Sequence, residues 1–149
     1  MKTMYAQGLE PQTTPATRVP LELERPAHQA YHILHWGFVI VPIVAGLDKF
    51  TQLLTNWDMY LAPVIANTVT NVTGLTAQTF MRGAGVIEVM AGLLVAFKPR
   101  IGAYVVAAWL GGIIVSLLLM QANYDIALRD FGLLLGALAL GRLSCLFDH

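Results

Sequence analysis

The sequence predicts an all-α integral membrane protein, a four-helix bundle with an interfacial helix between the first and second spans. Apolar residues make up 56% of the 149 residues and charged residues only 12%, which is unlike a soluble domain. The mean hydropathy is +0.62. Nine basic and nine acidic side chains cancel, so no net charge favours nucleic acid as a partner.

Residues 1–29 are predicted to form a Pro-rich, extended cytoplasmic tail, followed by a membrane domain over residues 30–149. The tail contains four prolines and no periodic apolar face, as is typical of segments that do not fold alone. The first apolar run begins only near Tyr31, which is too late for a secretory signal peptide. We expect the tail to tie the protein to its neighbours.

Four segments approach the length of about 20 residues that a helix needs to cross a bilayer. The first contains Pro42, where we expect a kink, because neighbouring helices can satisfy the carbonyl that proline leaves free. A basic turn at residues 98–100 separates the second from the third. The spans are predicted at residues 30–50, 80–97, 101–120 and 126–147.

Small residues recur in these spans at intervals that let membrane helices approach closely. They favour a compact bundle, although such residues are also common in membrane helices generally. They are Ala84 and Gly92 on the second span, Ala103, Ala107 and Gly111 on the third, and Gly132 and Gly136 on the fourth.

The longest connection, residues 51–79, carries one charge, Asp58. Its apolar residues approximate a helical stripe, and Trp57 and Tyr60 are suited to a membrane interface. The stripe consists of Leu61, Val64, Ile65, Val69 and Val72. We predict a helix lying on, or dipping into, the outer leaflet.

Basic residues in the short loops predict the orientation, since they concentrate on the cytoplasmic side. With both termini inside, six basic residues are cytoplasmic and three are external. The six are Lys2, Arg18, Arg25, Lys98, Arg100 and Arg142, and the three are Lys49, Arg82 and Arg129. The expected location is the bacterial inner membrane, with both termini in the cytoplasm.

Glu88 is an isolated acid within the apolar run of residues 83–97. A charge near the centre of a spanning helix costs roughly 2.5–3.5 kcal/mol, so it marks a functional site or an ion pair. One interpretation is a structural pair with Lys49 or Arg129; the other is a polar pocket for a quinone, a lipid headgroup or a proton. The candidate residues, all predicted at the outer end, are Asp48, Lys49, Arg82, Glu88, Arg129 and Asp130.

Four short motifs follow one another along the chain. They are a Gly-x-x-Lys helix end at residues 45–50, a helix with an internal Glu at residues 85–92, a basic turn at residues 97–100 and a helix start at residues 129–135. Together they resemble the motifs of DoxX-like membrane proteins, and the resemblance covers about residues 30–143. It implies a four-helix membrane fold and, through the family's archetype, a small subunit of a thiosulfate:quinone oxidoreductase.

His28, His32 and His35 fall within about 60° of one helix face, provided that the first helix begins early enough. Such an array could bind a transition metal, or one histidine could bind a haem or chlorin. The alternative is that these side chains lie at the interface and contact lipid phosphates or a partner.

The sequence contains no motif for a nucleophile, a phosphate loop or a dinucleotide, so we expect no catalytic activity from this chain alone. The leading hypothesis is an accessory subunit with a docking role in an electron-transfer or photosynthetic membrane complex. A second is a quinone-linked oxidoreductase subunit in which Glu88, Arg129 and Lys49 bind the quinone. A third is a small transporter, which would require an oligomer. The expected partners are lipids and other membrane-protein subunits, or further copies of the chain.

Overall fold

The computed structural model describes residues 21–121 and 123–147, and this part of the chain contains helices and no strands. Four of the helices are long and apolar enough to cross a membrane, so the protein is a multi-pass membrane protein. The predicted fold class is confirmed, including a short helix between the first two spans. The elements are α1 (Leu21–Thr51), the 3-10 helix η1 (Trp57–Tyr60), α2 (Pro63–Thr73), α3 (Ala77–Phe97), α4 (Pro99–Leu119) and α5 (Tyr124–Phe147).

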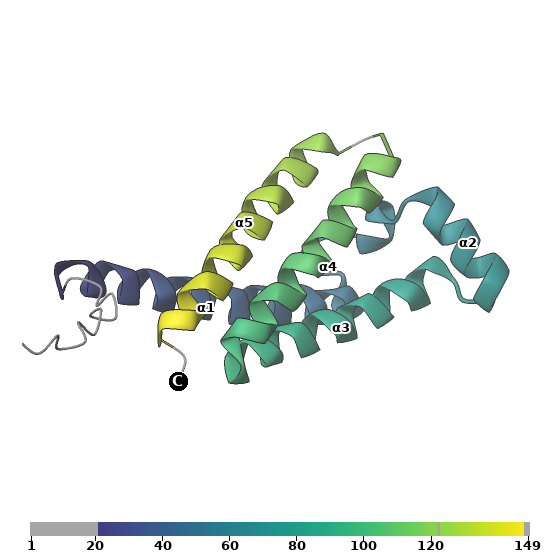
Figure 1. Ribbon diagram of the computed structural model, residues 1–149. Helices are drawn as coiled ribbons and strands as arrows, with labels where there is room; N and C mark the ends of the chain where they lie inside the picture. Colours follow the sequence, from purple (N-terminus) through teal and green to yellow (C-terminus); the bar gives the residue numbers. More distant parts are fainter. Residues whose placement is uncertain (1–20, 122, 148–149) are drawn as a thin grey trace, which may run out of the picture.

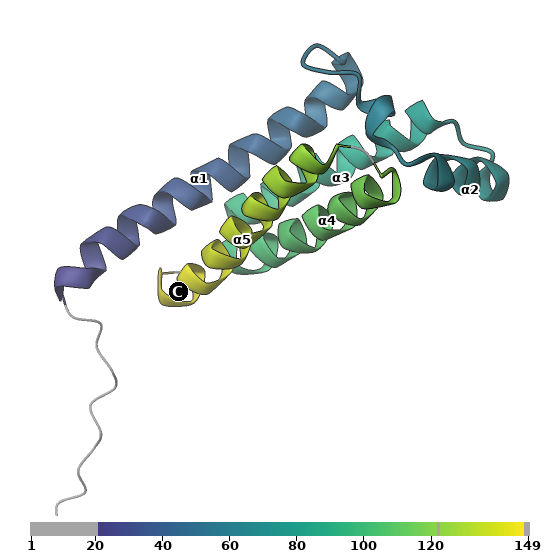
Figure 2. The same ribbon diagram turned by 90° about the horizontal axis from the view of Figure 1, so that it is seen from above.

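The four long helices run alternately up and down, and α1 packs mainly against α3, while α4 packs against α5 (Figures 1 and 2). One end of the bundle, here called the α2 end, holds η1, α2 and the α4–α5 turn. The opposite end, here called the Lys98 end, holds the start of α1, the α3–α4 turn at Lys98 and the end of α5. Both described termini therefore lie at the same end of the bundle.

Helix α1 begins at Leu21 rather than near Ala30. The predicted extended tail is therefore wrong for residues 21–29, and residues 1–20 lie outside the described residues. Pro26 is tolerated because it removes one hydrogen bond near the start of the helix, within a run of good helix formers. With 31 residues, α1 is about 46 Å long, well beyond the hydrocarbon core. Figure 2 shows its first turns extending past the bundle.

The α3–α4 turn is as short as a helical connection can be, with Lys98 alone between the two helices. Pro99 starts α4 but has no N–H to donate to the carbonyl of Val95 one turn earlier. The Nε2–H of His35 on α1 donates to that carbonyl over 3.1 Å. A Cβ atom on Gly102 would overlap the backbone of Val95, so this tight turn requires glycine there.

Two glycines bring the backbones of α1 and α3 into direct contact. A Cβ atom on Gly46 would lie 2.5 Å from the carbonyl oxygen of Gly85, and one on Gly85 would lie 2.6 Å from that of Gly46. Both distances are far below a normal van der Waals contact. The small residues therefore do produce close packing, but this pair is not among those predicted.

Some of the predicted small residues are packed between helices, and others are exposed. Ala103 and Ala107 lie in the buried core, and Gly92 packs against Ile43 of α1. A Cβ atom on Gly132, by contrast, would have no neighbour within 4 Å, so the expectation that Gly132 lies in a close helix contact is wrong. Gly132 is exposed, and spacing along one helix does not reveal how that helix is rotated in the bundle.

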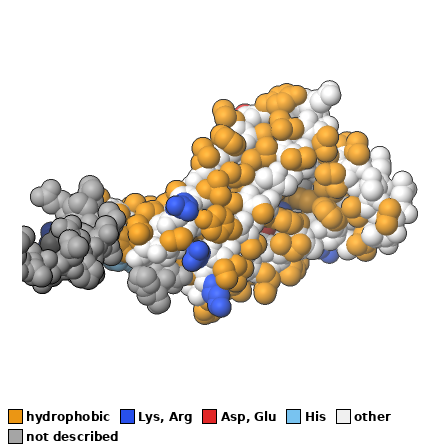
Figure 3. Space-filling view, viewed as in Figure 1, with side chains coloured by type: hydrophobic (Ala, Val, Ile, Leu, Met, Phe, Trp, Pro, Cys, Tyr) orange, Lys and Arg blue, Asp and Glu red, His pale blue; other side chains and the backbone are white. Residues whose placement is uncertain are grey.

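Large apolar side chains cover much of the surface of the bundle (Figure 3). Phe97 and Ile33, for example, are 81% and 74% exposed, as expected of side chains that face lipid. Helix α2 starts with Pro63 and ends before Gly74, whose φ of 72° suits glycine. None of its residues is buried, and Val64 and Val72 remain exposed. This is the pattern of a helix whose apolar face enters a membrane surface.

Candidate functional site

A buried ion pair joins α1 to α3 at the α2 end of the bundle. The Nζ atom of Lys49 lies 2.6 Å from Oε2 of Glu88, and only 5% and 6% of the two residues' surfaces are exposed. A buried charge without a partner is far more costly than a paired one. Of the two cations predicted to pair with Glu88, the structure selects Lys49.

The glycine contact explains why these two charges meet. Gly46 precedes Lys49 by three residues and Gly85 precedes Glu88 by three, so each charge lies about one turn beyond its glycine. A Cβ atom on Gly85 would lie 3.0 Å from Cβ of Lys49, which places the lysine stem directly over the glycine. A side chain at either glycine would push the helices apart and separate the ion pair.

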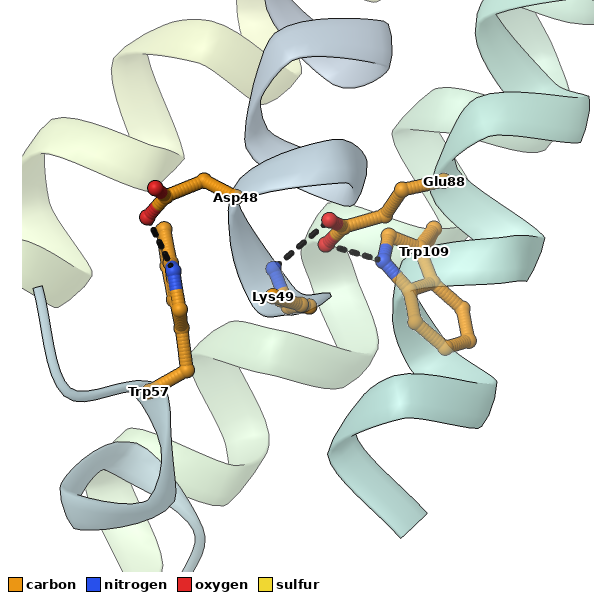
Figure 4. Close-up of polar contacts among 5 residues, drawn as sticks. All are labelled: Asp48, Lys49, Trp57, Glu88 and Trp109. Atoms are coloured by element: carbon orange, nitrogen blue, oxygen red, sulfur yellow. Dashed lines mark hydrogen bonds and ion pairs between the residues drawn. The ribbon is translucent and has the colours of Figure 1, made fainter. Parts of the chain in front are cut away.

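Helix α4 completes the coordination of Glu88. The indole Nε1–H of Trp109 donates to Oε1 of Glu88 over 3.1 Å, while Lys49 takes Oε2 (Figure 4). Each carboxylate oxygen thus has its own donor, from a different helix. A carboxylate bound in this way holds three helices together, because each of its oxygens accepts a hydrogen bond from a different neighbouring helix.

The Asp48 carboxylate holds residues 51–57, at the end of α1 and in the loop after it, in place through hydrogen bonds. Its Oδ1 atom accepts hydrogen bonds from the backbone N–H groups of Leu53 and Leu54, each 3.0 Å away, and from the hydroxyl of Thr51. Its Oδ2 accepts the indole N–H of Trp57 over 2.7 Å. With four donors around it, the buried carboxylate is well satisfied.

The loop folded by Asp48 in turn covers the ion pair. The Nζ atom of Lys49 lies 3.7 Å from the centroid of the Trp57 ring, a cation–π contact that is strengthened where water is excluded. In Figure 4 the indole of Trp57 stands on the side of Lys49 away from Glu88. The lysine is therefore enclosed between an aromatic face and a carboxylate.

Asp130 of α5 is the third buried carboxyl of this cluster, with 6% of its surface exposed. Its one hydrogen bond among the described residues comes from Nε of Arg129 over a long 3.4 Å, and the Arg129 side chain is 67% exposed. Asp130 also interacts electrostatically with Glu88 and Lys49. Arg129 thus pairs with Asp130, and the alternative that it pairs with Glu88 is not what the structure shows.

Arg82 does not join the cluster, although it is among the candidates. It is exposed and makes no ion pair among the residues that the structure describes. The cluster therefore consists of Asp48, Lys49, Glu88 and Asp130, with Arg129 at its margin.

The cluster contains three buried carboxyl groups and one buried cation, and Asp130 has the poorest set of partners. Replacing Asp130 with asparagine is therefore expected to stabilise the protein by about 1 kcal/mol, because a buried, weakly paired charge is removed. Thermal unfolding in detergent, followed by tryptophan fluorescence, measures the change. The control is Glu88→Gln, which leaves the buried Lys49 charge without its carboxylate partner and should lower the melting temperature. A loss of stability in Asp130→Asn comparable to that in Glu88→Gln would contradict this assignment.

The three histidines separate into a pair and a single residue. Nε2 of His28 and Nε2 of His32 are 3.2 Å apart, whereas Nε2 of His35 is engaged with the Val95 carbonyl. The described residues contain no cluster of three or more side chains placed to hold a metal ion. A haem or chlorin ligand at these positions stays a prediction.

Two members of the site, Trp57 and Trp109, are not predicted from the sequence. Trp57 is expected only at the membrane interface, and Trp109 lies in a span without charges. A signal for Trp109 is present, since an indole N–H inside a membrane helix needs an acceptor. Glu88 is an acceptor in the neighbouring span.

Comparisons with family models, with curated proteins and with solved structures find no match to this chain. The resemblance to DoxX-like proteins therefore stays a prediction from the four motifs. The class defined by the fold and the site is a multi-pass helical membrane protein with a buried ion-pair cluster.

Proposed function

We propose that this chain is a non-catalytic accessory subunit of a larger membrane complex. The observation that carries the proposal is the length of α1, whose 31 residues extend past the bundle at the Lys98 end. The surfaces of Glu24, Arg25 and Pro26 in this extension are exposed. An extended helical stem preceded by a Pro-rich segment is suited to docking outside the membrane.

The buried cluster supports the same proposal. Lys49, Glu88 and Asp48 satisfy one another or nearby backbone and indole groups, so the cluster is suited to fastening helices together. An electron-transfer or photosynthetic complex is the assembly we propose, and the resemblance to DoxX-like proteins supports the electron-transfer alternative. The lipid-facing surface of this chain would contact membrane lipids and neighbouring subunits.

Purification from native membranes tests this proposal. The tagged full-length chain is expected to migrate with a larger complex on native gels after mild solubilisation. Replacing residues 2–20 with a Gly/Ser segment of equal length should release it, while the melting temperature of the bundle stays unchanged. A chain that leaves native membranes as a lone, monodisperse species would contradict the accessory role.

The proposed location is the bacterial inner membrane with both termini cytoplasmic. Cys145 is the one cysteine of the chain and is exposed near the Lys98 end. A membrane-impermeant maleimide should label it in inverted vesicles and not in intact spheroplasts. In a Cys145→Ser background, Leu53→Cys at the α2 end should show the reverse pattern. The opposite pattern of labelling would invert the topology.

A quinone-linked subunit is the second candidate, favoured by one further observation. A wholly apolar groove of about 290 Å³ lies along α1 and ends at Trp57, beside the cluster. Its apolar lining suits part of an isoprenoid tail, and the quinone headgroup would then lie toward Trp57 and the buried cluster. The groove is lined by Ile40, Val41, Val44, Ala45, Leu54 and Trp57.

Val41→Trp distinguishes the quinone role from the structural one, because it fills the groove without touching the ion pair. Under the quinone hypothesis, it weakens quinone binding and lowers quinone-dependent turnover of the complex, whereas under the accessory role it leaves turnover unchanged. Glu88→Gln should also abolish turnover under the quinone hypothesis, but it leaves Lys49 without its partner, so its turnover is compared only where the complex still assembles. Unchanged turnover in Val41→Trp would exclude the quinone role.

A further inference from the structure

The first turns of α1 bring two imidazoles together on an exposed face. His28 and His32 are one helical turn apart, and a hydrogen bond joins their Nε2 atoms over 3.2 Å, so a bound metal ion would replace the shared proton. Both residues are exposed, so solvent and ions can reach them. The proposed docking role makes no use of this pair.

The spacing of the two nitrogens matches the bite of a transition metal. Imidazole nitrogens bind Zn²⁺ at about 2.0–2.1 Å, so two of them in tetrahedral or octahedral positions lie about 2.9–3.4 Å apart. Histidines four residues apart on a helix are a known way to supply two such ligands from one face. The 3.2 Å separation falls inside that range without movement of the backbone.

We propose that His28 and His32 form a bidentate site for a divalent transition metal ion of the zinc or copper class. Water would fill the remaining coordination positions, since no third ligating side chain from the described residues joins the pair. Zn²⁺ and Cu²⁺ are favoured because imidazole is a borderline ligand that suits them better than Mg²⁺ or Ca²⁺.

Neighbouring aromatic rings restrain both imidazoles. The ring of Phe147, from α5, meets His28 edge-on with a centroid distance of 5.3 Å. Tyr31 meets His32 at 5.5 Å, and the two imidazoles are nearly perpendicular, at 87°. Side chains held in place before binding lose less conformational freedom when the metal arrives. The contact with Phe147 also ties the site to the end of the bundle.

His35 provides a matched control within the same helix. Its Nε2–H is already donated to the Val95 carbonyl, so it should contribute nothing to metal binding. His149, the fourth histidine of the chain, lies outside the described residues and needs its own variant.

Titration of the full-length, metal-free protein in detergent with Cu²⁺ tests the proposal, with electron paramagnetic resonance as the readout. We expect one equivalent bound, with hyperfine splitting from two nitrogens. His28→Ala and His32→Ala should each weaken binding by at least roughly tenfold, and His35→Ala and His149→Ala should leave it unchanged. Melting temperatures confirm that each variant is folded. Equal affinity in wild type and the His28→Ala/His32→Ala double variant would overturn the site, as would an equal loss in His35→Ala.

Discussion

Replacing Lys49 with methionine is expected to destabilise the protein by about 3–5 kcal/mol, the usual consequence of removing one partner from a buried ion pair. Methionine keeps the apolar stem that lies over Gly85, so the loss isolates the effect of the charge. Glu88 would keep only the hydrogen bond from Trp109, and no cation would remain within the buried cluster. Unfolding in detergent, followed by fluorescence, gives the free-energy difference.

Arg82→Met is the matched control for Lys49→Met. Arg82 is also a cation at the α2 end, but it is exposed and unpaired among the described residues. Its loss should change stability by no more than about 0.5 kcal/mol, as is usual for surface substitutions. Equal effects of the two substitutions would mean that the Lys49–Glu88 pair contributes nothing beyond a surface charge.

Replacing Gly85 with alanine is expected to destabilise the protein by about 1–3 kcal/mol, as overpacking of a close contact does. The added Cβ would lie 2.6 Å from the carbonyl oxygen of Gly46. Backbone cannot rotate away as a flexible side chain does, so α1 and α3 must separate. That movement also lengthens the contact between Lys49 and Glu88.

Gly83→Ala provides a control two residues away on the same helix. A Cβ atom on Gly83 would have no neighbour within 4 Å, and alanine favours a helix by up to about 1 kcal/mol over glycine. This variant should be as stable as the wild type or slightly more so. If Gly85→Ala behaves like Gly83→Ala, the helices do not approach as closely as the structure shows.

The spans could be predicted because membrane insertion depends on local properties, namely length and hydropathy. The apolar stripe of residues 61–72 likewise predicts α2 from local pattern alone. The start of α1 could not be predicted, because Pro26 suggests a boundary and the helix continues through it. A proline near a helix start removes one bond only, and whether the chain accepts that loss depends on packing beyond the segment.

The four buried charged residues of the cluster are among the six predicted from the sequence, but the exclusion of Arg82 and the pairing of the charges could not be predicted. Both Lys49 and Arg129 are reasonable partners for Glu88, and the choice depends on how α1 and α5 rotate about their axes. In the structure Arg129 points outward and Lys49 inward. The glycines carry a usable signal, because Gly46 and Gly85 each precede a charged residue by three positions.

A double-mutant cycle on Lys49 and Glu88 tests our claim that Glu88 is a structural partner of Lys49. The free energy of unfolding is measured for the wild type, Lys49→Met, Glu88→Gln and the double variant. If the claim is right, each single substitution destabilises strongly and the double variant recovers much of the loss, since no unpaired charge remains at these two positions. Losses that simply add in the double variant would show that the two side chains act independently, and would contradict the account.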